Sequence, residues 1–121
     1  MVKRLNKQTG SRGEQAASDM LEQKGYEILT HNYRNKWGEV DVVAKVGETV
    51  VFVEVKTKTG EQYGEPWEMI DRHKLKQVEN MGYVWCEDFG WKGLCRTDVV
   101  GVWLDNEGEV TRLEHWENVQ L

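Results

Sequence analysis

The chain has 121 residues, of which 31% are charged and 39% hydrophobic, and its formal net charge is −5. These values suit a single soluble domain with a modest core and exclude a disordered chain. No apolar run approaches the roughly 20 residues of a membrane-spanning helix, and the only two cysteines lack a zinc-site spacing, so we expect a cytoplasmic protein with free thiols.

The N-terminal segment differs from the rest of the chain in charge. Its charged residues are all basic: Lys3, Arg4, Lys7 and Arg12. We expect residues 1–12 to form a flexible basic arm and residues 13–121 to form one domain. The overall acidity argues weakly against a non-specific nucleic-acid binder, and the basic arm weakens that argument.

A helix is expected from about residue 12 to residue 24. Ser11 and Glu14 have the spacing of a capping box, in which Glu14 is the N3 residue, and Gly25 suits the end of a helix. Apolar residues recur between them at helical spacing, at Ala16, Ala17, Met20 and Leu21. Alternating and valine-rich stretches then predict three strands, at residues 26–34, 39–45 and 49–57.

The second half of the chain predicts one more helix and two more strands. Pro66 suits the first turn of the helix, and its apolar stripe is Trp67, Ile70, Val78, Met81 and Trp85. Strands are expected at residues 96–103 and 109–113. The order α-β-β-β-α-β-β predicts an α/β fold, in which helices flank a mixed central sheet.

The second and third strands form a hairpin with an unusual pair of acids. A two-residue turn at Gly47-Glu48 places Asp41 opposite Glu54, and Glu39 opposite Lys56. Alternation along the strands gives one wholly apolar face, formed by Val40, Val42, Ala44, Val51, Val53 and Val55. The other face is also apolar near the turn, so we expect the hairpin to lie in the centre of the sheet, with the polar cluster at its open end.

Two opposed carboxylates about 5 Å apart repel each other by roughly 3 kcal/mol at an effective dielectric constant of about 20. A divalent cation between Asp41 and Glu54 would reverse the sign of this energy, and oxygen ligands suit Mg²⁺ or Mn²⁺. Lys56 would place a positive charge beside a phosphate. In the competing interpretation, these residues lie on an ordinary edge strand and Glu39 forms an ion pair with Lys56.

The spacing Asp41…Glu54-x-Lys56 resembles the signature of the PD-(D/E)XK nuclease superfamily, with Val40 in the place of the proline. More closely, the chain resembles the YraN family of small uncharacterised bacterial proteins, in the stretches "GYEILTHNYR", "GEVDVVA", "VVFVEVKTKTG", "RTDVV" and "EHW". The resemblance implies a restriction-endonuclease-like core, with Asp41 and Glu54 as metal ligands and Lys56 as the catalytic lysine. It also implies that Glu14, at the place of a glutamate in junction resolvases, joins the metal site.

Other residues have two interpretations each. Glu14 is either a helix cap or an auxiliary acid of the site. Glu39 is a candidate for a residue that orients the metal ligands without binding the metal itself. Lys74 interrupts the apolar stripe of the second helix, and it either extends to solvent or points at a phosphate. Residues suited to nucleic-acid contacts, rather than only to a solvated surface, are Lys58 and Arg34 for phosphates and Trp37 for stacking on a base.

Together these features predict a nuclease that uses Mg²⁺ or Mn²⁺ to hydrolyse phosphodiester bonds. The metal ligands would be Asp41, Glu54 and the backbone carbonyl of Val55. We expect nucleic acid as the partner, with DNA favoured over RNA and branched DNA as one candidate substrate. We expect no membrane contact, and we expect a homodimer. The alternatives are a module of the same fold that binds nucleic acid or a partner without cleaving, and a structural domain without any metal site.

Overall fold

The computed structural model describes residues 2–60 and 66–120. Its elements are α1 (Val2–Gln23), β1 (Glu27–Asn35), β2 (Gly38–Val46), β3 (Thr49–Thr59), the 3₁₀ helix η1 (Pro66–Met69), α2 (Arg72–Phe89), β4 (Leu94–Leu104) and β5 (Val110–Trp116). The expected order α-β-β-β-α-β-β and the α/β class are therefore confirmed.

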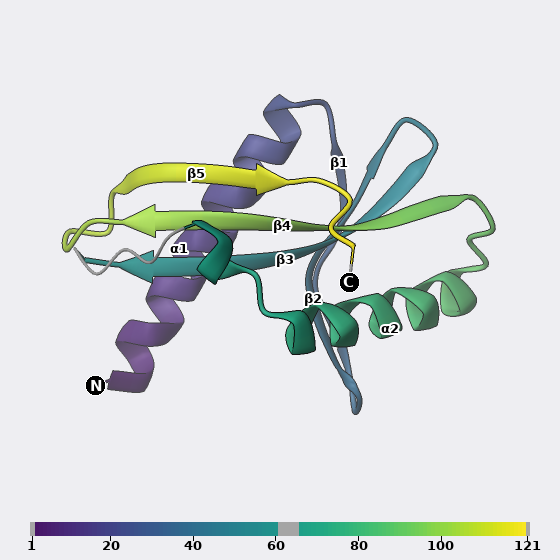
Figure 1. Cartoon of the computed structure of the whole chain (residues 1–121), viewed down its shortest axis with the longest axis horizontal. Helices are drawn as coiled ribbons and strands as arrows, with labels where there is room; N and C mark the ends of the chain where they lie inside the picture. The colour runs from purple at the N-terminus through teal and green to yellow at the C-terminus, as the bar shows by residue number, and fades with distance from the viewer. Residues whose placement is uncertain (1, 61–65, 121) are drawn as a thin grey trace.

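All five strands form one mixed sheet, in the spatial order β1-β2-β3-β4-β5. β3 and β4 are parallel, because the chain crosses over between them through α2, and the other neighbours are antiparallel. The sheet is strongly twisted, so that β1 and β2 run across the direction of β4 and β5 (Figure 1). The β2–β3 hairpin thus occupies the middle of the sheet, as its two apolar faces predicted.

The two helices cover opposite faces of the sheet (Figure 1). The core under α1 contains Ala16, Ala17, Leu21, Val42, Ala44, Val51, Val53, Val100 and Val102, among others. The core under α2 contains Val40, Val43, Val50, Phe52, Val78, Met81 and Trp85. Each fully buried valine contributes about 1.5–3 kcal/mol, so these two cores hold the hairpin in place.

The start of α1 differs from the expected one. The helix begins at Val2, so Ser11 and Glu14 lie in its interior and the capping-box interpretation is wrong. Most of the segment that was expected to form an arm, from Val2 onward, forms the first turns of α1. Its flexibility stays a prediction. The end of the helix is as expected, because Gly25 has a φ of 93° and Tyr26 N–H donates to the Leu21 carbonyl at 2.9 Å.

The start of α2 also differs. Pro66 begins η1, and α2 begins six residues later, where the Asp71 side chain accepts a hydrogen bond from the Lys74 N–H at 3.1 Å. Asp71 is thus the N-cap that sequence analysis missed. The predicted stripe is confirmed for Val78, Met81 and Trp85, whereas the side chain of Trp67 lies outside the described residues.

The structure also bears on the expectations about thiols and membranes. Cys86 and Cys95 are both free, as expected. Within residues 2–60 and 66–120, no helix is both long enough and apolar enough to cross a membrane.

Candidate metal site between β2 and β3

The hairpin register is as predicted near the turn and changes at the site. Backbone pairing runs from Val46 with Thr49 to Val42 with Val53, and the next pair, Asp41 with Glu54, is not formed. Instead, the backbone N–H of Val55 donates to Oδ2 of Asp41 at 2.7 Å. A carboxylate therefore takes the place of a backbone carbonyl between the two strands, at the point where they separate.

A distortion of the neighbouring strand accompanies this separation. Asn32 has a φ of 53°, and the pairs of β1 with β2 on either side of it place Asn32 across from Asp41. Val42 packs in the core under α1, whereas Val40 packs in the core under α2. The expectation that Val40 shares a face with Val42 and Ala44 is therefore wrong, because strand alternation is interrupted at Asp41.

The Glu54 carboxyl group is buried without a complete set of partners. The residue is only 3% exposed, and its Oε2 atom accepts no hydrogen bond. Burial, and after it the Asp41 carboxyl group, raises the pKa of Glu54 to about 9. A buried carboxylate oxygen with a free lone pair, beside a second carboxylate, is the donor set that a cation would satisfy.

Two lysines lie on the Glu54 side of the sheet. Nζ of Lys74 is 4.0 Å from Oε2 of Glu54 and 3.0 Å from Oε1 of Gln77, so this ammonium group is turned toward the site rather than extended into solvent. Lys56 follows Glu54 by two residues on β3 and lies on the same face. Both lysines act to lower the pKa of Glu54, but burial outweighs them.

Glu14 reaches the site from α1, on the other face of the sheet. A side chain at Gly13 would place its Cβ only 1.9 Å from Oγ1 of Thr57, so glycine allows α1 to approach β3 closely at this point. Burial, followed by the Asp41 carboxylate, raises the pKa of Glu14. The helix thus brings a third carboxyl group near Asp41, and the auxiliary role expected for Glu14 stays a prediction.

The residues present fit a small oxygen-ligated cation. In a strand, the N–H and C=O of one residue point the same way, so the Val55 carbonyl lies on the same side of β3 as its N–H, which bonds to Asp41. Among the residues that the structure describes, no three Asp, Glu, His or Cys side chains converge at metal-binding distances. The candidate ligands are therefore Asp41, Glu54 and the Val55 carbonyl, and water or phosphate would complete the shell of Mg²⁺.

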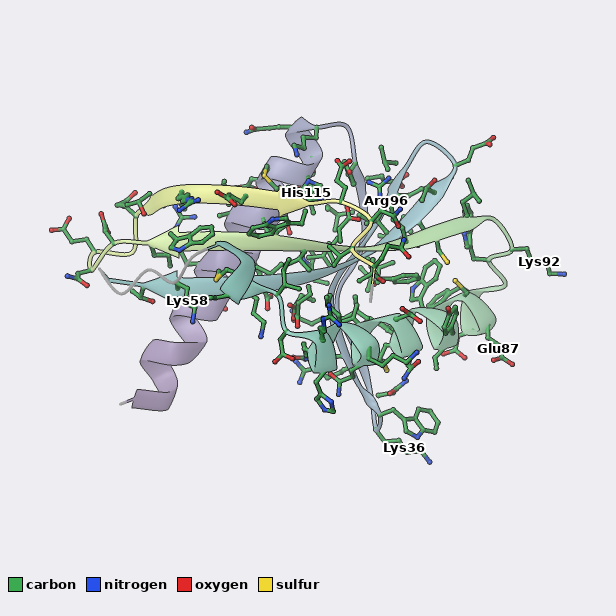
Figure 2. The ribbon with its side chains drawn as sticks, in the orientation of Figure 1. Lys36, Lys58, Glu87, Lys92, Arg96 and His115 are labelled. Carbon is green, nitrogen blue, oxygen red and sulfur yellow. The ribbon has the colours of Figure 1, made fainter. Side chains whose placement is uncertain are left out.

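Glu39 on β2 and Lys58 on β3 lie beyond the point where the two strands separate, and the phosphate contact expected of Lys58 stays a prediction. Glu39 pairs with Arg34 across β1 and β2, at 3.1 Å between Oε2 and Nη2, and does not form the ion pair with Lys56 that the competing interpretation expected. The reason is that β2 has already separated from β3 at this point. Lys58 is exposed farther along β3, where Figure 2 shows it away from α2.

Trp37 occupies the turn between β1 and β2. It is 64% exposed, and Nζ of Lys36 lies 4.7 Å from its ring centroid. Figure 2 shows Lys36 at the tip of this hairpin, beyond α2. An indole ring left in solvent beside cationic side chains is consistent with the expected contact to a base.

A polar network on the α1 face was not foreseen in full. Asp98 is completely buried and accepts hydrogen bonds from Arg96 Nε at 3.0 Å, His115 Nε2 at 2.8 Å and Asn118 N–H at 2.8 Å. Although burial raises the pKa of Asp98, the hydrogen bonds from His115 and Arg96 hold it below its usual value. The sequence signals were "RTDVV" and "EHW", which lie too far apart in the chain for spacing to show that they meet.

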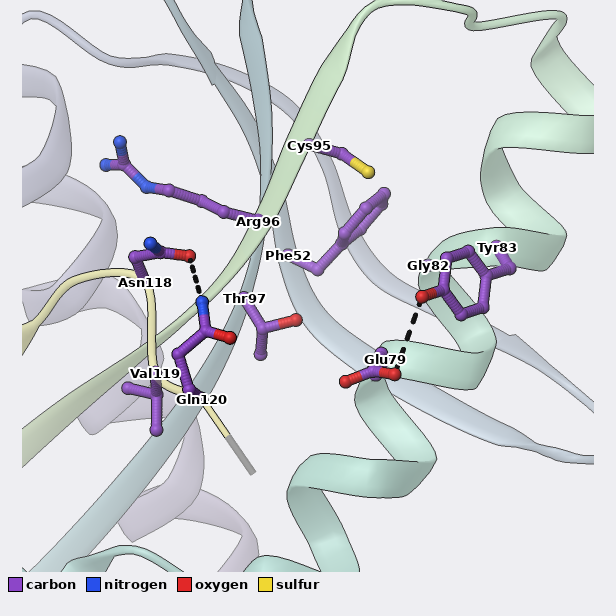
Figure 3. Close-up of a pocket in the computed structure, with 10 residues that line it drawn as sticks. All are labelled: Phe52, Glu79, Gly82, Tyr83, Cys95, Arg96, Thr97, Asn118, Val119 and Gln120. Carbon is purple, nitrogen blue, oxygen red and sulfur yellow. Dashed lines mark hydrogen bonds between the residues drawn. The ribbon is translucent and has the colours of Figure 1, made fainter.

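A separate cavity of about 280 Å³ lies between α2 and the C-terminal segment, lined among others by Phe52, Glu79, Thr97 and Gln120 (Figure 3). Arg96 starts at its edge but points away from α2. Among the residues described here, Glu79 is the one acid that lines the cavity, so it lacks the paired carboxylates of a metal site.

Both a family model and individual protein sequences match this chain. The model of the "Uncharacterised protein family UPF0102" matches residues 13–102. The chain is 43% identical over 110 residues to a UPF0102 protein of Pelotomaculum thermopropionicum, covering 90% of this chain and 92% of that protein. It is 41% identical over 106 residues to a UPF0102 protein of Moorella thermoacetica, covering 87% of this chain and 88% of that protein. These names state no activity.

Proposed function

Because the chain belongs to the UPF0102 family, the YraN-type family that its sequence resembles, its activity has to be inferred from its site, and we propose that it is a metal-dependent nuclease of the PD-(D/E)XK superfamily. One observation carries this proposal. The buried Glu54 carboxyl group has an oxygen without a hydrogen bond, and it lies beside Asp41 where β2 and β3 separate. Such a pair destabilises a metal-free fold and is explained by cation binding.

In this proposal Asp41, Glu54 and the Val55 carbonyl hold Mg²⁺ or Mn²⁺. The cation supplies Lewis acidity toward a phosphate oxygen and toward the attacking water. The hydrogen bond from the Val55 N–H fixes the Asp41 carboxylate, so that its other oxygen stays available in the gap between the strands. The sheet thereby presents its oxygen ligands in advance of binding.

The lysines and Glu14 have separate roles. Lys56 stabilises the negative charge that builds up on the phosphate during hydrolysis, and Lys74 neutralises the phosphate as it enters. Glu14, whose pKa is raised by burial and by Asp41, accepts a proton near the attacking water. Arg34 is held by Glu39 through one contact and retains four further N–H groups for contacts to the nucleic-acid backbone.

The substrate in this proposal is nucleic acid, and we favour DNA. A domain of this size offers one such site, so cleavage of both strands of a duplex would need a second copy of the chain. A homodimer in the cytoplasm therefore belongs to the proposal.

A second candidate is a module that binds nucleic acid without cleaving it. The net charge of −5 favours it, and so does the finding that Glu14, although near Asp41, does not converge with Asp41 and Glu54 at metal-binding distances among the described residues. Lys56 then has no catalytic task, and this difference separates the two candidates.

Single-turnover cleavage with Mn²⁺ tests the proposal on branched, single-stranded and duplex DNA and on RNA. We expect Lys56→Ala to reduce cleavage at least about 100-fold with Mn²⁺ affinity retained, because the lysine acts on charge in the transition state. Lys92→Ala, at an exposed lysine between α2 and β4, is the control, and we expect its rate to stay within about twofold of the wild type. Binding without cleavage of any of these substrates would favour the module instead.

A further inference from the structure

The β1–β2 turn holds Trp37 in a fixed position beside α2. Its backbone N–H donates to Oδ1 of Asn35 at 2.8 Å, and Nε2 of Gln77 donates to its carbonyl at 3.4 Å. Gly38 follows with a φ of 153°, and a Cβ there would lie 2.7 Å from the Gln77 side chain. The turn is therefore docked on α2, while the indole ring stays 64% exposed.

Two hollows, each of about 400 Å³, lie beside Trp37. Trp37 and Gln77 line both of them. The first, here called the basic hollow, is also lined by Arg34, Lys36, Glu39 and Lys74. The second, here called the indole hollow, is also lined by His73, Lys76, Asn80, Met81 and Val84.

The two hollows differ in chemistry. The basic hollow has three cationic side chains and one acid, Glu39, which is paired with Arg34 at 3.1 Å. This excess of positive charge on a chain with a net charge of −5 suits an anion such as a phosphate. The indole hollow combines an aromatic wall and the apolar side chains of Met81 and Val84 with polar groups that can hydrogen-bond, which suits a planar heterocycle.

Lys74 connects the basic hollow with the metal site. It lines the hollow, and its Nζ atom lies 4.0 Å from Oε2 of Glu54. A phosphate bound there would therefore lie next to the acid pair. Glu39, two residues before Asp41, lines the same hollow.

We infer that this protein acts on nucleic acid with an unpaired nucleotide, whose base stacks on Trp37 in the indole hollow and whose phosphate enters the basic hollow. The inference rests on the proposed function and adds the substrate class. In a duplex both faces of each base are covered by its neighbours, so only a single-stranded or splayed base offers a face to an indole ring. An exposed indole ring on a turn that is docked against α2 thus selects against intact duplex.

Binding of a fluorescein-labelled single strand of about 12 nucleotides, and of the same sequence as a blunt duplex, tests this inference by anisotropy. Both are measured at one salt concentration with EDTA, so that cleavage plays no part. We expect tighter binding of the single strand. Trp37→Ala should weaken single-strand binding about tenfold and duplex binding less than about twofold, and Trp37→Phe should retain most of the affinity.

Tyr83→Ala is the matched control, because Tyr83 is also an exposed aromatic residue, 60% accessible, and lies on α2 outside both hollows. Its single-strand affinity should equal that of the wild type. Equal affinity for single strand and duplex, or an unchanged affinity in Trp37→Ala, would overturn the inference and leave Lys56-dependent cleavage intact. A cleavage rate that Lys56→Ala leaves unchanged would count against the proposed function instead.

Discussion

At the scale of single residues, Glu54 connects stability with pH. Its pKa in the folded protein is raised to about 9 from an ordinary value of 4.5, first by burial and then by Asp41. Between these two values the folded state binds more protons than the unfolded chain. The free energy of unfolding therefore falls as the pH rises from about 4.5 to about 9. Below this range Glu54 is protonated in both states, so burying it costs no charge.

Glu54→Gln is accordingly expected to stabilise the metal-free protein. The amide carries no charge to bury, so the free energy of unfolding at pH 8 should rise by about 1–2 kcal/mol, with little change at pH 4. Urea unfolding at both values measures this. Glu22→Gln, at an exposed position of α1, should change neither value. A loss of stability in Glu54→Gln of equal size at both pH values would contradict the account.

Residues also show where sequence reasoning succeeded. The two-residue turn at Gly47, where φ is 57°, sets the register, so the approach of Asp41 to Glu54 followed from the sequence. The separate faces of Val40 and Val42, and the partner of Glu39, did not follow. They accompany a positive φ at Asn32 in the neighbouring strand, which no local pattern in β2 reveals.

At the scale of elements, the approach of α1 to β3 depends on Gly13. The nearest atoms to a Cβ at this position belong to Thr57, whereas a Cβ at Gly10 would meet nothing within 4 Å. Both residues lie inside the same helix. Substituting each of them by alanine therefore separates the effect of close packing from the effect of helix propensity.

Gly13→Ala is expected to lower the free energy of unfolding by about 1–3 kcal/mol, because it forces α1 away from β3. Gly10→Ala should raise it by roughly 0.5–1 kcal/mol, since alanine favours a helix interior. Thermal unfolding of both variants measures the contrast. Adding Thr57→Ala to Gly13→Ala should recover part of the loss, and a failure to recover any would locate the strain elsewhere.

The elements themselves were predictable in type and order, and less so in their ends. Hydrophobic periodicity marks where a strand or helix packs, so the five strands and the stripe of α2 were found. The early start of α1 at Val2 was missed, because its first turns are polar and Ser11 with Glu14 imitates a helix start. The late start of α2 was missed because Pro66 begins a short 3₁₀ turn before the Asp71 cap.

At the scale of the whole molecule, the Asp98 network joins parts that are distant in sequence. Nζ of Lys24 at the end of α1 donates to Nδ1 of His115 at 2.9 Å, so the other ring nitrogen carries the proton that His115 donates to Asp98. Nη2 of Arg96 donates to the Tyr26 hydroxyl at 2.7 Å. The network thus ties the start of β1 and the segment after β5 to the middle of β4.

Asp98→Asn is expected to lower the free energy of unfolding at pH 7 by about 3–5 kcal/mol, since it leaves Arg96 without its buried counter-charge. The pKa of Asp98 is lowered in the folded protein, so its contribution is present above the ordinary value of 3.8 and is lost as pH falls below it. The difference between variant and wild type should therefore shrink at pH 3 in urea unfolding. Asp19→Asn, at an exposed site on α1, serves as the control.

The network and the two hollows beside Trp37 lay beyond sequence reasoning, for one physical reason. They are formed by side chains from separate elements, and no spacing along the chain encodes such contacts. The candidate site of Asp41 and Glu54 was accessible because its two acids belong to one hairpin, whose turn determines their separation.

The central claim is that Asp41 and Glu54 bind one divalent cation between β2 and β3. The most direct measurement is the anomalous difference density of crystals grown with Mn²⁺. We expect a single strong peak within about 2.0–2.5 Å of a carboxylate oxygen of each acid and of the Val55 carbonyl oxygen. Crystals grown with saturating Mn²⁺ would contradict the account if they show no peak in this gap while both carboxylates are placed as they are here.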